Sequence, residues 1–296
     1  MLKHHKSLLI GVCLLLVLPL AACTNKNKTK PNKINVVTSV NFYSDVAKKV
    51  GGNHVKVQSI INSNVDPHDF EPTINDSKKV NEANVVIDNG VGYDDWMNNI
   101  LASANTKHIK NITVATLLHA SDGSNEHLWY NPATMPKLAD KLAQVYSKQD
   151  PKHERQYEAN AKQYQKDWQP IQKLLNTIKQ NSHDASVAVS EPVFNYSLQA
   201  MGYKVIDPDF ANSVDKGVDP SVQDISQLQN QIKHHQITFF VNNTQSYDPV
   251  VTNMVKLAKQ NHIPIVNVTE TQPKGKTYLQ WMTDEYQQVL KIQQKQ

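Results

Sequence analysis

Cysteine is nearly absent from this chain of 296 residues, which has only Cys13 and Cys23. Cys13 lies in an apolar run from Leu8 to Leu20, and Cys23 follows this run after two alanines. A cationic start, an apolar run too short to span a bilayer comfortably and a small-residue cleavage site are typical of a signal peptide. We expect residues 1–22 to be removed, so the mature chain would hold neither an internal disulfide nor a cysteine-based zinc site.

Arginine and glycine are also scarce, with Arg155 as the single arginine and nine glycines in all. Arginine suits forked contacts with phosphate and guanine, so its scarcity, with a net charge of only +4, argues against a nucleic-acid partner. No glycine-rich phosphate loop is present. With 39% hydrophobic and 20% charged residues, the chain is neither disordered throughout nor a multi-span membrane protein.

Short β-branched runs alternate with amphipathic stretches in two parts of the chain. Such alternation predicts parallel sheets with crossover helices. The predicted strands are Ile34–Thr38, Val55–Ile61, Val85–Asp88, Ile112–Ala115, Ser186–Val189, Lys204–Ile206, Thr238–Val241 and Pro264–Val268. The predicted helices between them are Tyr43–Val50, Asp76–Asn84, Asp94–Ala104, Gln223–His234 and Pro249–Gln260.

The middle of the chain, from about Ala133 to Gln180, lacks strand signals and is rich in Leu, Ala, Lys and Gln. Asp150-Pro151 divides it, because proline disfavours helix at the residue before it and suits the first helical turn. We expect a long helix over Pro151–Lys179, kinked at Pro170. A helix of this length could connect and brace two lobes.

Four short segments carry side chains that could bind a metal: Val65–Pro72, Glu126–Pro132, Val189–Pro192 and Val268–Thr271. In open α/β sheets, ligands bind beyond the carboxyl ends of the strands, where all four segments could lie. Two imidazoles and two carboxylates would suit a divalent transition metal. No chelating pair is close in sequence, however, so these segments alone leave a metal site and ordinary structural loops as open alternatives.

Five motifs, in this order, resemble the zinc/manganese solute-binding lipoproteins of bacterial ABC importers. They are Asp66–Pro72, Asn89–Trp96, His127–Pro132, Asp150-Pro151 with Tyr157–Asn160, and Tyr278–Met282. The resemblance implies two Rossmann-like α/β lobes with parallel sheets, joined by a long rigid backbone helix, with the metal in the interlobe cleft. At the positions of the family's four metal ligands this chain has His68, His127, Glu191 and Glu270.

The chain is accordingly expected to comprise five segments. These are a lipoprotein signal peptide at 1–22, a flexible tether at 23–33, an N-terminal lobe at 34–132, a helical connector at 133–183 and a C-terminal lobe at 184–296. The tetrad that ends at Cys23 resembles a bacterial lipobox, which implies acylation of that cysteine and a lipid anchor on the extracytoplasmic face of the cell membrane.

The ligand set bears on the metal. Glu191 stands where zinc-type members often carry a third histidine, and Glu270 replaces the commoner aspartate. A carboxylate in place of an imidazole hardens the site, and oxygen-rich ligand sets suit Mn²⁺. We therefore favour Mn²⁺ over Zn²⁺ as the bound ion, with Fe²⁺ a minor alternative.

The resemblance implies a monomeric binding protein, not an enzyme, that passes its metal to an ABC permease and its ATPase. Two alternatives remain at this stage. A metallohydrolase would need an open coordination position and a general base, for which Glu71 is available. A surface adhesin is the other, although no residue pattern here indicates a host partner.

Overall fold

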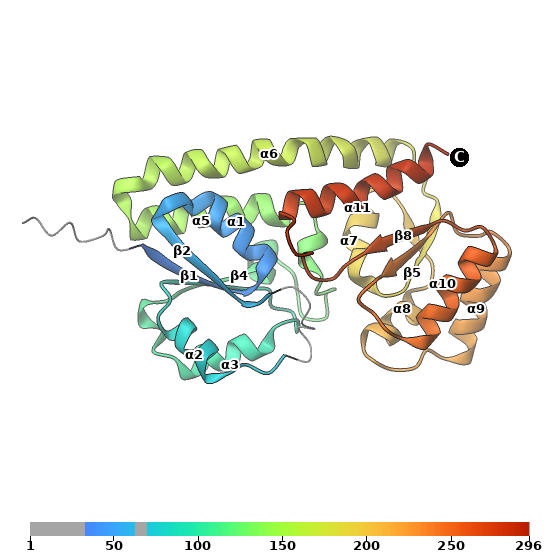
Figure 1. Cartoon of the computed structure of the whole chain (residues 1–296), viewed down its shortest axis with the longest axis horizontal. Coiled ribbons are helices and arrows are strands. Elements are labelled where there is room, and N and C mark those ends of the chain that lie inside the picture. The colour runs from blue at the N-terminus through green and yellow to red at the C-terminus, as the bar shows by residue number, and fades with distance from the viewer. Residues whose placement is uncertain (1–32, 63–69, 296) are drawn as a thin grey trace, which may run out of the picture. The chain divides into compact units, whose positions relative to one another are not determined.

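The computed structural model describes residues 33–62 and 70–295 (Figure 1). Within these ranges, none of the helices is both long enough and apolar enough to cross a membrane. The described part contains two parallel sheets of four strands each. We call the first sheet with its helices the N-terminal lobe, and the second the C-terminal lobe.

The N-terminal lobe has its strands in the order β2-β1-β3-β4. Val36 of β1 pairs with Val57 of β2 on one side and with Val85 of β3 on the other. Helices α1 and α5 (Thr134–Gln149) lie on one side of the sheet, and α2 and α3 lie on the other (Figure 1). The bounds are β1 Ile34–Val40, α1 Asn41–Gly51, η1 Gly52–His54, β2 Val55–Ile61, α2 Ile74–Asn81, β3 Val85–Asp88, α3 Asp95–Ser103, η2 Thr106–His108, β4 Lys110–Thr113, α4 Val114–Leu118 and η3 Leu128–Tyr130.

The C-terminal lobe repeats this arrangement, with the order β6-β5-β7-β8 and parallel pairing throughout. In both lobes the order reverses beside the first strand, so each has a topological switch point, where α/β proteins commonly bind ligands. The bounds are β5 Ser186–Val189, η5 Pro192–Phe194, α7 Asn195–Ala200, β6 Lys204–Val205, α8 Pro208–Asp215, α9 Val222–Lys233, β7 Phe240–Asn243, α10 Pro249–Gln260, β8 Ile265–Val268 and α11 Tyr278–Gln293.

The connector contains α5 (Thr134–Gln149), η4 (Pro151–His153) and the long helix α6 (Glu154–Gln180). Buried residues recur on α6 every three or four positions, which gives it one apolar face. That face packs on α1 of the N-terminal lobe, on α5 and on α11. The predicted connecting helix is confirmed, and it continues through Pro170, which is exposed, as a single helix.

Local signals in the sequence set several helix starts. Thr73 and Asp76 form a capping box at α2, and Thr277 and Gln280 form another at α11. Each pair satisfies two backbone N–H groups that have no partner within the helix. At α10 the Asp248 side chain accepts from the N–H of Val250.

The predicted α/β architecture with two parallel sheets is confirmed. The predicted strands Val55–Ile61, Val85–Asp88 and Ser186–Val189 have the observed bounds. The strand predicted at Ile112–Ala115 begins and ends two residues earlier: β4 ends at Thr113, and α4 begins at Val114. Pairing with β3 fixes both ends of β4, because Lys110 pairs with Val85 and Thr113 pairs with Asp88.

Candidate metal centre

Glu191 lies just beyond the end of β5, at the switch point of the C-terminal lobe. The amide Nδ2 of Asn243, the last residue of neighbouring β7, donates to Oε2 of Glu191 at 2.5 Å. The backbone N–H of Asn243 donates to Oγ of Ser190 at 2.9 Å. The ends of the two central strands therefore fix the Glu191 carboxylate in place.

Glu270 lies two residues beyond the end of β8. Oε1 of Gln245 accepts from the backbone N–H groups of both Glu270 and Thr271, at 2.7 and 2.8 Å. The Nε2 of the same glutamine donates to Oγ1 of Thr271 at 2.8 Å. A single amide side chain thus holds the backbone that presents Glu270.

His127 is 1% exposed and lies directly before η3. Asn125 Oδ1 accepts from the backbone N–H of His127 at 2.9 Å and lies 2.8 Å from its ring Nδ1. The amide Nδ2 of Asn125 donates to the carbonyl of Pro192 at 2.7 Å, which fixes the oxygen toward the histidine. Because that oxygen can only accept, Nδ1 of His127 carries the proton and Nε2 is the nitrogen suited to a metal.

The Nε2 of His127 faces Asp215, the last residue of α8, with its Oδ1 at 3.8 Å. Ligand atoms of Glu126, His127 and Asp215 all lie within 4.8 Å of one another. Burial raises the pKa of Asp215 to about 7, and the carboxylates of Glu126 and Glu191 add to this rise. This concentration of negative charge around one imidazole would be relieved by a bound cation.

Tyr93 connects His127 with Glu270. Its buried ring meets the His127 ring edge-on, with centroids 6.4 Å apart. Burial raises the pKa of Tyr93 well above its usual value, and the charge of Glu270 is the next largest cause. Both predicted ligands therefore border the same tyrosine, although they come from different lobes.

A buried glutamate on α11 fastens the two ligand-bearing loops together. Glu285 Oε1 accepts from Trp281 Nε1 at 2.7 Å and from the backbone N–H of Thr269, next to Glu270, at 3.0 Å. Glu285 Oε2 lies 2.8 Å from the hydroxyl of Tyr130, in the η3 segment that follows His127.

The protonation of this glutamate follows from its neighbours. The Tyr130 hydroxyl also lies 2.6 Å from the carbonyl oxygen of Thr269, which can only accept, so the tyrosine proton points there. The contact between Tyr130 and Glu285 then needs a proton on the glutamate. Burial raises the pKa of Glu285 to about 8, so the protonated form prevails at neutral pH.

Of the predicted ligands, Glu191 and Glu270 lie just beyond the ends of β5 and β8, and the buried His127 lies in the loop before η3. The remaining predicted ligand, His68, and the predicted lipidation site, Cys23, lie outside the described residues. Sequence reasoning missed Asp215 as a neighbour of His127. It ends a helix with no recognisable motif, so only the fold brings it to the site.

Two parallel α/β lobes beside one long helix define the fold class of periplasmic metal-binding proteins. The solved structure of the binding protein FpvC from Pseudomonas aeruginosa, in complex with Mn²⁺, matches with a TM-score of 0.73 and 19% identity, over 89% of this chain and 99% of that one. The family described as zinc-uptake complex component A, periplasmic (ZnuA), matches residues 36–291, and this chain belongs to it.

Two curated relatives differ in the metal that their names give. The high-affinity zinc uptake system protein ZnuA of Bacillus subtilis is 25% identical over 251 residues, which cover 77% of each chain. The manganese-binding lipoprotein MntA of Halalkalibacterium halodurans is 25% identical over 193 residues, or 62% of this chain and 63% of that protein. Family membership therefore leaves the choice between these ions to the local chemistry.

Proposed function

We propose that this chain captures a divalent transition metal outside the cytoplasmic membrane and delivers it to an ABC permease and its ATPase. The observation that carries the proposal is the buried His127, whose Nε2 faces the Asp215 carboxylate beside Glu126. A proton-bearing Nδ1 and a carboxylate-lined Nε2 are what a metal-binding imidazole requires. Membership in a family of uptake components supports the same function.

We infer that His68, His127, Glu191 and Glu270 are the protein ligands of this ion. The positions of Glu191 and Glu270 beyond the ends of β5 and β8, and the proximity of Tyr93 to both His127 and Glu270, support this set. Asp215 adds a carboxylate near His127, either as a further ligand or as compensation for the charge of the ion. The cation would offset the repulsion from Glu126 and Glu191, which adds to the effect of burial in raising the pKa of Asp215.

Mn²⁺ is the favoured cargo, ahead of Zn²⁺ and then Fe²⁺. Carboxylates outnumber imidazoles around His127, and oxygen ligands suit manganese better than nitrogen ligands do. Zinc nevertheless binds most mixed nitrogen and oxygen sites more tightly than manganese. Preference in the cell would then follow metal availability as well as the ligand set.

We further propose that the protein acts as a monomer and is anchored by an acylated Cys23. The names of relatives such as the lipoprotein MntA support an anchored, extracytoplasmic protein. A Cys23→Ala variant should move from the membrane fraction to the soluble fraction. Retention of that variant in washed membranes would argue against the anchor.

A non-enzymatic function is the one proposed, because both relatives are named for uptake or binding of a metal. The hydrolase that the sequence left open would have required a coordination position kept for water and a base beside it. Adhesion stays a prediction, to be tested only after metal binding is measured.

The test is a titration of metal-free protein with Mn²⁺ and with Zn²⁺, followed by thermal unfolding. Each ion that binds only the folded state should raise Tm in proportion to the logarithm of its concentration above Kd. Binding should weaken below about pH 6.5, because the ligand histidines must lose their protons. If neither ion raises Tm at millimolar concentration, the proposed function is wrong.

A further inference from the structure

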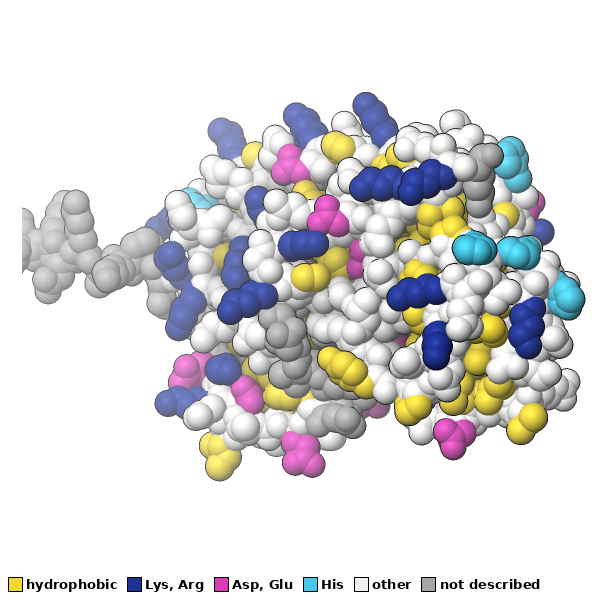
Figure 2. All heavy atoms as spheres, turned by 45° about the vertical axis from the view of Figure 1, so that its right-hand side comes forward, with side chains coloured by type: hydrophobic (Ala, Val, Ile, Leu, Met, Phe, Trp, Pro, Cys, Tyr) yellow, Lys and Arg dark blue, Asp and Glu magenta, His cyan; other side chains and the backbone are white. Residues whose placement is uncertain are grey.

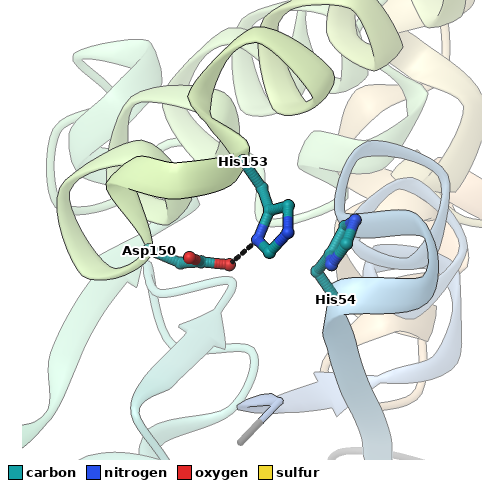
Figure 3. A group of neighbouring side chains, drawn as sticks. All are labelled: His54, Asp150 and His153. Carbon is teal, nitrogen blue, oxygen red and sulfur yellow. Dashed lines mark hydrogen bonds and ion pairs between the residues drawn. The ribbon is translucent and has the colours of Figure 1, made fainter. Parts of the chain in front are cut away.

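Two turns that are far apart in sequence meet beside the first turn of α6. His54 ends η1, between α1 and β2, and His153 ends η4, between α5 and α6. Their imidazole rings stack, with centroids 3.7 Å apart and planes inclined by 20° (Figure 3). Neither turn belongs to the segments that form the candidate metal centre.

Asp150 fixes one of the two rings. Its Oδ2 lies 2.6 Å from Nδ1 of His153, as the dashed line in Figure 3 shows, and it also accepts from the Tyr157 hydroxyl at 2.8 Å. Burial acts to raise the pKa of Asp150, but the hydrogen bonds from His153 and Tyr157 outweigh it and lower the pKa. The Nδ1 side of His153 is thus occupied by the Asp150 carboxylate, and Nε2 is the ring nitrogen suited to a metal.

The surrounding structure holds both turns. Tyr157 is fully buried and meets the His54 ring edge-on, with centroids 5.9 Å apart. Nδ2 of Asn160 on α6 donates to the carbonyl of Val50, near the end of α1, at 2.9 Å. The two imidazoles are thus carried by elements that are already fastened to each other, while the side chains of His54, Asp150 and His153 remain partly open to solvent.

We propose that His54 and His153 bind a second divalent transition metal, with Asp150 holding the His153 ring and balancing the charge. A carboxylate that accepts from the far nitrogen of a histidine is the usual partner of a metal-ligating imidazole. Imidazole nitrogens select Zn²⁺, Cu²⁺ or Ni²⁺ over Mn²⁺, so Zn²⁺ is the expected ion. Water would complete its coordination, and the ion would clamp the η1 turn to the start of α6.

The distances permit this with small movements. Ligand atoms of His54, Asp150 and His153 lie within 4.8 Å of one another. Two nitrogens on one zinc ion lie at most about 4.2 Å apart, because each Zn–N bond is roughly 2.1 Å. Because the two rings are stacked, their in-plane lone pairs run nearly parallel, so the partly exposed His54 ring must rotate to direct a nitrogen at an ion bound to His153.

The test counts Zn²⁺ bound per molecule of the processed chain in detergent, by competition with a chromophoric chelator. The reference is the processed protein without substitutions, which lacks His4 and His5 because both lie in the expected signal peptide at residues 1–22. We expect two ions for this reference, one for the His54→Gln/His153→Gln variant and one for His127→Ala. The Asp150→Asn variant should still bind two ions, but its affinity for one of them should fall about 10-fold, as expected for an outer partner of a histidine ligand.

The matched control removes another pair of surface histidines. His234 and His235 are exposed at the end of α9, in the C-terminal lobe, where Figure 2 shows histidines gathered on the surface. The His234→Gln/His235→Asn variant should still bind two ions. If it loses one as well, or if the His54/His153 variant loses none, the second site is overturned.

The two proposals fail in different ways. If the reference binds one ion that survives His127→Ala and disappears in the His54/His153 variant, the surface site stands and the proposed cargo site fails. If the reference binds one ion that survives in the His54/His153 variant and disappears in His127→Ala, only the surface site is wrong. Thermal unfolding without metal checks that each variant folds. In the His127→Ala background, Cu²⁺ electron paramagnetic resonance should show coupling to two imidazole nitrogens, and to one nitrogen when His54→Gln is added.

Discussion

The two clusters of potential metal ligands differ in burial and in chemistry. The first surrounds the buried His127 with the carboxylates of Glu126 and Asp215, from the loop before η3 and the end of α8. The second stacks the partly exposed His54 and His153 with one carboxylate, between turns of the N-terminal half. A buried site rich in oxygen suits capture of a hard ion, and an open site rich in nitrogen suits a softer one. The two proposals together predict that Mn²⁺ binds in the first cluster and Zn²⁺ in the second.

The largest effect should come from His127→Ala, which removes the imidazole at the centre of the first cluster. Since the variant loses one of the four proposed ligands outright, Mn²⁺ affinity should fall more than about 100-fold, beyond the 10–100-fold usual for outer partners. Titration of metal-free protein measures this. An affinity within 10-fold of the unmodified protein would show that His127 is not a ligand.

A smaller loss is expected for Asp215→Asn, which keeps the shape of the side chain and removes its charge. Mn²⁺ affinity should fall about 10-fold, because less negative charge faces the ion. In the metal-free protein the same variant should be at least as stable as wild type at pH 8, since the repulsion from Glu126 and Glu191 is relieved. Lower stability at pH 8 would contradict the charge cluster.

Variants of Glu285 test whether the stability of the metal-free protein depends on protonation of this glutamate. Its folded-state pKa of about 8 lies above the ordinary value, so its stabilising effect is complete below pH 4.5 and is lost as pH rises through about 8. Glu285→Gln imitates the protonated form, because its amide can both donate to Tyr130 and accept from Trp281.

Unfolding of metal-free protein by urea, from pH 5 to pH 9, should therefore show a shallower loss of stability in Glu285→Gln than in wild type. The difference in unfolding free energy should reach about 1–3 kcal/mol at the alkaline end, at 1.36 kcal/mol per pKa unit and with discount for relaxation. Glu285→Ala should be the less stable of the two variants at every pH. Parallel curves for wild type and Glu285→Gln would mean that the glutamate is ionised throughout.

The smallest effect separates the two clusters. Mn²⁺ affinity of His54→Gln/His153→Gln should stay within about twofold of wild type, because neither side chain reaches the first cluster and distant sites act independently. A larger change would mean that the two clusters are coupled through α6 or the core.

Much of the fold could be predicted from local pattern. Apolar runs such as Val85–Asp88 are buried on both faces of a parallel sheet, so their bounds are visible in the sequence. Short helices were harder to predict. The α8 helix, with Asp215 at its end, has eight residues and a mixed pattern, and its place is set by the fold around it.

The candidate site divides in the same way. His127 and Glu270 lie in segments that a motif or a strand end marks, so their importance could be predicted. The partners that position them could not. Asn125 acts through the carbonyl of Pro192, and Glu285 reaches Thr269 from a helix sixteen residues later, which only a three-dimensional arrangement reveals.

The side chains of β5, in the C-terminal sheet, belong to two different hydrophobic clusters, and this bears on how cooperatively the protein unfolds. Val187 and Val189 of β5 join the large hydrophobic cluster that also contains residues of β1 and α6, whereas Ala188 between them joins a smaller cluster. One face of the C-terminal sheet is thus continuous with the interior of the N-terminal lobe. Melting of either lobe would expose that shared interior, so the two lobes should unfold in a single transition.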